Sequence, residues 1–155
     1  MPIFLAFVGI WELGEFWMTS LIVEHAAFAG ARAGAVYIPV AGADGVASNR
    51  LTDENKSLID ETVMLAAAPA VARGWLADAP AVFFPRSLRG DDSEATEYSV
   101  TSPSMVHVQV VAPFRCHFPP LDYLLCSREG KEWTLPILAH GSFPYAGARY
   151  KYEPK

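Results

Sequence analysis

Charged residues are scarce where this sequence begins. The chain has 155 residues, of which 12 are Lys or Arg and 17 are Asp or Glu. Within residues 1–40, however, the charged residues are only Glu12, Glu15, Glu24 and Arg32. The whole chain is 52% hydrophobic, which is more than an ordinary soluble domain contains. We therefore expect the N-terminal quarter to lie in lipid or among other helices.

Clusters of basic residues and the common catalytic motifs are also missing. The net charge is −5, whereas nucleic-acid binding depends on clustered Lys and Arg side chains that neutralise phosphates. The sequence contains no glycine-rich phosphate loop, no nucleophile elbow, no paired-cysteine zinc spacing and no two histidines at helical ligand spacing. We therefore expect no nucleic-acid partner, no cofactor and no enzymatic activity.

Cysteine is rare, since the chain contains only Cys116 and Cys126. Two cysteines are too few for a disulfide scaffold, but they suffice to close one loop. Together with His117 they offer three metal ligands, yet a fourth ligand and the usual paired spacing are missing. The two residues are therefore a candidate disulfide, with two buried thiols as the alternative. A disulfide would imply an oxidising compartment.

Two polar segments carry weaker signals. The segment RGDDSEATE offers calcium ligands but lacks the spacing of an EF-hand loop, so we expect a solvated loop there. Its carboxylates are Asp91, Asp92, Glu94 and Glu97. Asn55 begins the glycosylation sequon Asn-Lys-Ser, but it also suits the first turn of a helix.

The apolar N-terminal segment predicts one long helix from Ile3 to about Tyr37. Only scattered glycines weaken this helix, and Pro2 stands in a first turn, where proline is tolerated. The segment is apolar on nearly all sides. At 1.5 Å per residue it would be roughly 50 Å long, which exceeds the width of a small domain. We therefore expect its first half to protrude.

The rest of the chain predicts a second helix and then a sheet. Thr52 is a fair N-cap for a helix over 53–68. Pro69 should end or kink this helix, with a continuation by a turn or two over 70–77 as the alternative. The period then changes to two, because valines alternate with other residues over 105–114. Further strands are predicted over 134–143 and 148–153, with a weaker one over 81–85 and a loop over 37–50.

These elements define an α+β fold in two parts. A hydrophobic N-terminal helix, residues 1–38, packs on a globular head domain, residues 39–155, that contains the second helix and a small antiparallel sheet. At this length we expect one modest hydrophobic core.

A stripe of small residues lies on one face of the long helix. Ala26, Gly30 and Gly34 are four apart, a pattern that lets another backbone approach closely. That backbone belongs either to a neighbouring subunit or to the protein's own sheet. Arg32 marks the point where the helix leaves the dry environment, and its partner is either Glu24 or an acidic group on another chain.

Glu12 and Glu15 lie three apart on the apolar helix. An ionised carboxylate is costly in such a place unless it finds a cation or a hydrogen-bond donor. The two residues therefore mark either a boundary with solvent or a buried pairing with another subunit.

The segment GIWELGEFWMTSLIVEHAAFAGARAGA, residues 9–35, resembles the N-terminal signature of TadE-like proteins, which are pilin-like proteins of the tight-adherence branch of type IV pili. The first half of that signature matches Gly9, Glu12 and Gly14. The second half matches Ala26, Ala27, Gly30, Ala31 and Arg32, and the spacing between the halves agrees. Residues 100–150 agree more loosely, and residues 40–100 match no pattern of the family.

The sequence departs from the family in two places. Members of the family carry a basic residue where this chain has Glu15, so the electrostatic partner of this position differs. Members also begin with a leader and a prepilin-peptidase site, followed by a glutamate, apolar residues and a proline. This sequence starts near that proline, and the processing site is not within it.

The resemblance implies a type IV pilin-like fold and a structural role. The helix would first sit in the inner membrane and then pack with copies of itself, or with other pilin-like subunits, in an extracellular filament used for adhesion or surface contact. The alternative is a membrane-anchored minor pilin or assembly factor of the same apparatus. The residues expected to pack between subunits are Phe4, Phe7, Trp11, Glu12, Glu15, Ala26, Gly30, Arg32 and Gly34.

Overall fold

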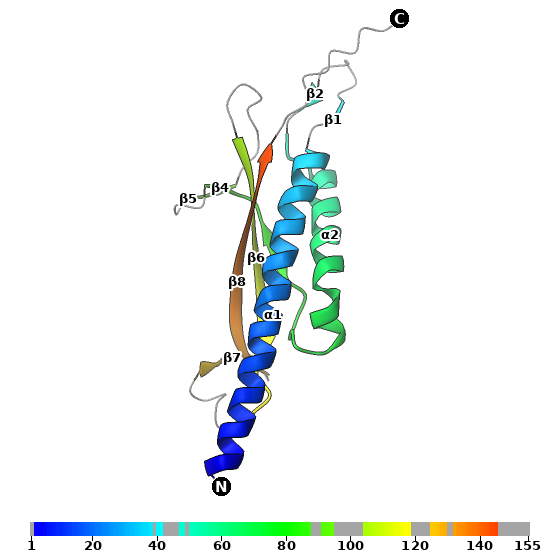
Figure 1. Cartoon of the computed structure of the whole chain (residues 1–155). Helices are drawn as coiled ribbons and strands as arrows, with labels where there is room; N and C mark the ends of the chain where they lie inside the picture. Colours follow the sequence, from blue (N-terminus) through cyan, green and yellow to red (C-terminus); the bar gives the residue numbers. More distant parts are fainter. Residues whose placement is uncertain are drawn as a thin grey trace, which may run out of the picture.

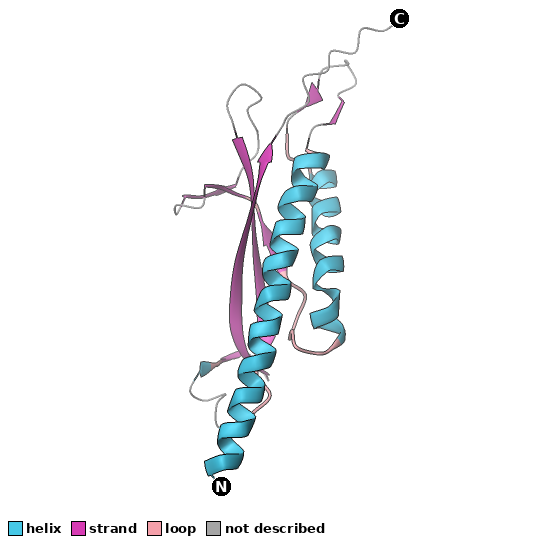
Figure 2. Ribbon diagram, viewed as in Figure 1, coloured by secondary structure: helices cyan, strands magenta, loops and turns pink. Residues whose placement is uncertain are grey.

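Two helices cover one face of an antiparallel sheet in the computed structural model (Figures 1 and 2). This two-layer arrangement confirms the α+β class, with a long apolar helix at the N-terminus. The structure describes residues 2–38, 40–41, 47–48, 50–87, 91–94, 104–118, 125–129 and 132–145.

Helix α1, Pro2–Tyr37, has 36 residues and is uninterrupted, as predicted. Its N-terminal end extends past the end of the sheet (Figure 1). The expectation that the whole first half protrudes is wrong, because only residues 3–7 are exposed on every side. From Val8 onward one face of the helix is buried, and this face continues through Thr19 and Val23 to Ile38.

Helix α2, Asp53–Ala72, begins as predicted. The Thr52 side chain accepts a hydrogen bond from the backbone N–H of Asn55 at 3.3 Å, which satisfies one of the free donors of the first turn. Asp53 and Glu54 in that turn complement the positive end of the helix dipole.

Helix α2 continues three residues beyond Pro69, in agreement with the alternative of a further turn. The proline is inside the helix, and the last turn closes through bonds from the N–H groups of Gly74 and Trp75 to the carbonyls of Val71 and Ala70. Gly74 has a φ of 72°, a left-handed conformation that glycine adopts at low cost. This pair of bonds is a Schellman motif, and it ends the helix in place of the proline.

The main sheet has the strand order β3-β6-β8-β7 and is antiparallel throughout. Val106, Val108 and Val110 are fully buried on the face toward the helices, which confirms the predicted alternation. The predicted strand over 148–153 lies outside the described residues. The strands are β3 (Ala81–Phe83), β6 (Ser104–Arg115), β7 (Ser127–Glu129) and β8 (Glu132–Tyr145).

Short strand pairs replace two predicted loops in part. Strands β1 (Val40–Ala41) and β2 (Ala47–Ser48) pair within the predicted 37–50 loop. Strand β4 (Pro85–Ser87) pairs with β5 (Asp91–Glu94), so the acidic segment begins as a strand and not as a loop. Glu97 lies outside the described residues.

One core holds the two layers together. Val23 and Ala27 of α1, and Ile38 directly after it, are fully buried. They belong to the same cluster as Ile59 and Val63 of α2 and the valines of β6. The expected boundary at residue 38 therefore marks the end of a helix, and the second half of α1 shares its core with the head.

Candidate functional site

The N-terminal half of α1 carries a large exposed apolar surface. Its side chains are between 49% and 85% exposed, whereas soluble monomers rarely expose contiguous apolar patches larger than a few hundred Å². We call this the N-terminal apolar surface, and its residues are Ile3, Phe4, Leu5, Phe7, Ile10, Trp11, Leu13, Trp17, Met18 and Leu21. A surface of this kind is expected to be covered by lipid or by protein.

Helix length and composition allow a membrane as the cover. Residues Ile3–Tyr37 form a helix long and apolar enough to cross a bilayer, with a mean hydropathy of 1.3 in its most apolar window. A spanning helix needs about 20 apolar residues, and α1 exceeds that length.

Glu12 is buried between α1 and the sheet, with only 8% of its surface exposed. Its Oε1 accepts a hydrogen bond from the backbone N–H of His117 at 3.0 Å. Its Oε2 is inaccessible to solvent and has no hydrogen-bond partner among the described residues. A buried carboxylate oxygen without a donor costs free energy, so this atom is poised to accept one.

Glu15 lies at the edge of the same region. Its Oε1 accepts a hydrogen bond from Nε1 of Trp11 at 3.0 Å, and its Oε2 lies 3.9 Å from Nδ1 of His117. These side chains line a hollow of about 170 Å³ together with Arg73 and Trp75. Glu15 therefore has polar neighbours within its own chain, in keeping with the solvent-boundary alternative.

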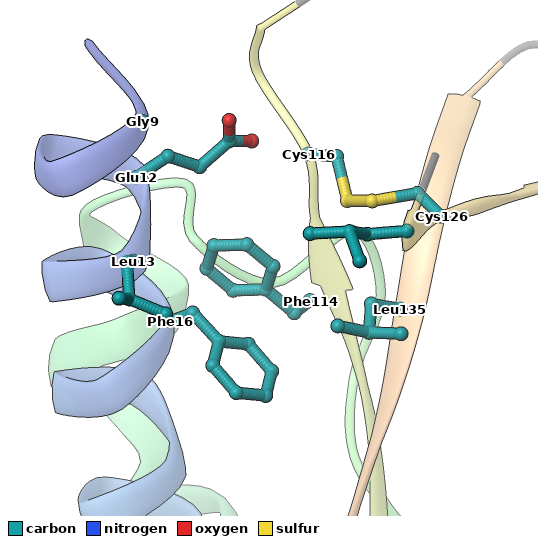
Figure 3. Close-up of a pocket in the computed structure, with 9 residues that line it drawn as sticks. Gly9, Glu12, Leu13, Phe16, Phe114, Cys116, Cys126 and Leu135 are labelled. Atoms are coloured by element: carbon teal, nitrogen blue, oxygen red, sulfur yellow. A yellow bond between two sulfur atoms is a disulfide. The ribbon is translucent and has the colours of Figure 1, made fainter. Parts of the chain in front are cut away.

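An apolar cavity of about 380 Å³ lies between α1 and the sheet (Figure 3). The side chains of Glu12 and Phe16 both point from α1 toward the sheet, and the Glu12 carboxylate lies above the rings of Phe16 and Phe114 (Figure 3). The two phenylalanine rings meet edge to face, with centroids 5.4 Å apart. The cavity is lined by Gly9, Glu12, Leu13, Phe16, Phe114, Cys116, Leu125, Cys126 and Leu135.

Cys116 and Cys126 form a disulfide, which confirms the candidate pair. The bond joins the residue after β6 to the residue before β7 and forms one wall of the cavity (Figure 3). Because His117 directly follows Cys116, the disulfide also fixes the position of the backbone N–H that donates a hydrogen bond to Glu12.

The stripe of small residues is packed inside the protein. A Cβ atom added at Gly30 would lie 2.6 Å from Cγ2 of Val63, and one added at Gly34 would lie 2.9 Å from Cγ1 of Val106. Ala26 is fully buried as well. The expectation that these three positions pack between subunits is therefore wrong, because α2 and β6 of the same chain already occupy that face.

Gly141 of β8 makes the closest approach to α1, and the sequence reading did not single it out. A Cβ atom at this position would collide with the backbone carbonyl of Ala27 and lie 2.8 Å from the backbone nitrogen of Phe28. An isolated glycine within a strand pattern is the signal that marks such an approach.

Arg32 is exposed and makes no ion pair, with Glu24 or any other acid, within the described part of the chain. It borders a groove of about 420 Å³ between the C-terminal half of α1 and α2. The other residues that line this groove are His25, Phe28, Ala29, Ala33, Val36, Tyr37 and Thr62.

Other polar signals in the described residues have structural explanations. Asn55 is buried, and its Nδ2 donates to the carbonyl of Arg50 at 3.4 Å, so the sequon is not open to a glycan. No cluster of three or more His, Cys, Asp or Glu side chains is placed to hold a metal ion within the described ranges.

Burial shifts the pKa values of Asp60 and His107, because it removes their side chains from water. Desolvation raises the pKa of Asp60, despite nearby Lys56, and lowers the pKa of His107.

The comparisons with known proteins add no relative. The chain matches no protein-family model, and neither a curated protein nor a solved structure is significantly similar to it.

Proposed function

We propose that this chain is a pilin-like structural subunit of a filament of the tight-adherence type. The observation that carries the proposal is the N-terminal apolar surface on a helix whose opposite face is anchored in a folded head. The second half of α1 packs against α2, β6 and β8, so the head fixes the position of the first half. We call this first half, which carries the N-terminal apolar surface, the apolar rod. The resemblance of residues 9–35 to the TadE-like signature favours the same function.

The drive for assembly would come from burying this rod against other copies. Burial of a Leu, Ile or Phe side chain is worth about 1.5–3 kcal/mol relative to full exposure. The side chains of the rod are 49–85% exposed, so covering all of them stabilises an assembly on the order of 10 kcal/mol. Before assembly, the same surface would be covered by the inner membrane.

A pair of matched variants tests this role. Phe7→Glu places a charge on the rod, at a side chain that is 65% exposed. Leu65→Glu places the same charge on α2, at a side chain that is 69% exposed but outside the rod. Electron microscopy of material sheared from cells should show filaments for the wild type and Leu65→Glu, and none for Phe7→Glu.

Two results would contradict the proposal. One is wild-type protein that stays monomeric in solubilised membranes and never enters a filament. The other is normal filaments from Phe7→Glu.

A membrane-anchored minor pilin or assembly factor is the second candidate. The observation that favours it is that Ile3–Tyr37 is long and apolar enough to cross a bilayer. Immunogold labelling distinguishes the two, because a filament subunit is labelled along the filament, whereas an assembly factor is labelled only at the cell envelope.

A further inference from the structure

We propose that the Glu12 cavity binds an indole side chain, namely Trp17 of a second copy of this chain. This inference deepens the proposed function and rests on it, because it names one contact by which two subunits join. The carrying observations are the cavity itself, the unpartnered Oε2 of Glu12 buried at its wall, and an exposed tryptophan on the other side of the same helix.

The chemistry of the cavity favours an aromatic occupant that carries one hydrogen-bond donor. Its described lining side chains are apolar apart from Glu12, so it favours a large apolar body. Oε2 of Glu12 requires a donor, because Oε1 already accepts from His117. An indole supplies an apolar body and one N–H donor, whereas a guanidinium would bring five N–H groups to a single free acceptor. A phenylalanine ring would leave the carboxylate oxygen unpaired.

Trp17 is the tryptophan of this chain that remains free to act in this way. Nε1 of Trp11 already donates to Glu15, and Trp75 is partly buried beneath the guanidinium of Arg73, 4.7 Å from its ring centre. Trp133 is partly buried against the core. Trp17 is 66% exposed and makes no hydrogen bond or ring contact with the described residues.

The positions of donor and acceptor make the contact intermolecular. Trp17 follows Glu12 by five residues, which is about 140° around a helix and about 7.5 Å along it. Glu12 faces its own sheet, so Trp17 faces away from the cavity and cannot enter it within one chain. Two of the residues that line the cavity, Leu13 and Leu125, are 61% and 64% exposed, so the cavity is open to solvent on their side.

Trp17 and the Glu12 cavity lie on different faces of the molecule, so the contact between them is heterologous. Such contacts do not close on themselves as a two-fold dimer does, and they generate open helical polymers when repeated. Each copy would place Trp17 in the next copy's cavity and receive another tryptophan in its own.

The first experiment tests the cavity with small probes. Binding of 3-methylindole and of 1,3-dimethylindole, which lacks the N–H, is measured on the full chain in detergent, from the methyl NMR signals of Leu13, Leu125 and Leu135. We expect 3-methylindole to bind at least tenfold more tightly, as a charge-assisted hydrogen bond implies. In Glu12→Gln, an amide N–H would oppose the indole N–H, so this preference should disappear.

Either of two outcomes overturns the site. Equal affinity of the wild type for both probes would mean that the cavity takes any apolar group, such as a lipid chain. A tenfold preference that persists in Glu12→Gln would mean that the indole N–H is read elsewhere. Neither measurement requires filaments. The indole site can therefore be disproved while the filament role stands, and the filament role can be disproved while the site stands.

The second experiment tests the partner. Trp17→Phe and Glu12→Gln each remove the same hydrogen bond, so each should raise the critical concentration for assembly about tenfold, and the double variant should be no worse than either. Thermal unfolding of the unassembled variants checks that they fold. Additive losses in the double variant, or normal assembly of Trp17→Phe, would overturn the assignment of Trp17.

Discussion

At the scale of single residues, Gly141 leaves less room for a side chain than Gly14, Gly30, Gly34 or Gly74. Gly141→Ala would drive a methyl group into the backbone of α1 at Ala27, where no side chain can move aside. We expect the free energy of unfolding to fall by about 3 kcal/mol, measured by denaturant titration.

Gly14 provides the matched control for this substitution. A Cβ atom at Gly14 meets nothing within 4 Å, and the residue lies inside α1. Gly14→Ala should therefore stabilise the protein by about 0.5–1 kcal/mol through helix propensity alone. A loss of stability at Gly14, or none at Gly141, would contradict the packing described for α1 and β8.

His107 makes the stability of the protein depend on pH in the acid range. Its Nδ1 is buried without a partner among the described residues, and desolvation lowers its pKa below the usual 6.5. The unfolded chain takes up a proton at the usual pKa, whereas the folded chain resists it. The contribution of neutral His107 to stability is therefore complete above about pH 6.5 and is lost as the pH falls from there through the lowered pKa.

Urea titrations at pH 7.5 and pH 5.5 measure this effect. The loss of stability between the two values should be smaller in His107→Gln than in the wild type. His140→Gln, at an exposed position of β8, should keep the wild-type loss. An unchanged loss in His107→Gln would assign the acid sensitivity to other groups.

At the scale of elements, the Cys116–Cys126 bond ties the end of β6 to the start of β7 across a separation of 10 residues. Closing a loop of this size stabilises a fold by about 2–3 kcal/mol in the chain-entropy description. We expect Cys116→Ser/Cys126→Ser to unfold at lower denaturant concentration by about this amount. Cysteines of the native protein should resist alkylation until a reductant is added, and rapid labelling without reductant would contradict the disulfide.

At the scale of the whole molecule, the two halves of α1 have different tasks. The second half is a core element, since its small residues let α2 and β6 approach closely at Gly30 and Gly34. The first half packs on one side only and leaves the rest of its apolar surface outside. The proposed filament role requires such a division, because one helix must both hold the head and leave an apolar surface for other subunits.

Local sequence determined much of this arrangement. The length of α1, the N-cap at Thr52 and the buried valines of β6 follow from hydropathy, capping chemistry and a period of two, all of which act over a few residues. At Pro69 the sequence left open an end, a kink or a further turn, and the capping bonds around Gly74 decided for a continuation of three residues.

Only the tertiary structure decided which surfaces are free. The small-residue stripe allowed packing on a sheet or on another subunit, and the choice depended on where α2 and β6 lie. Glu12 accepts its hydrogen bond from His117, which is 105 residues away in the sequence. Its second carboxylate oxygen, Oε2, has no donor because the fold brings none of the described donors to it. The sequence by itself determined the elements and their apolar faces, because these depend on neighbouring residues. The contacts between distant segments decided which apolar faces stay exposed.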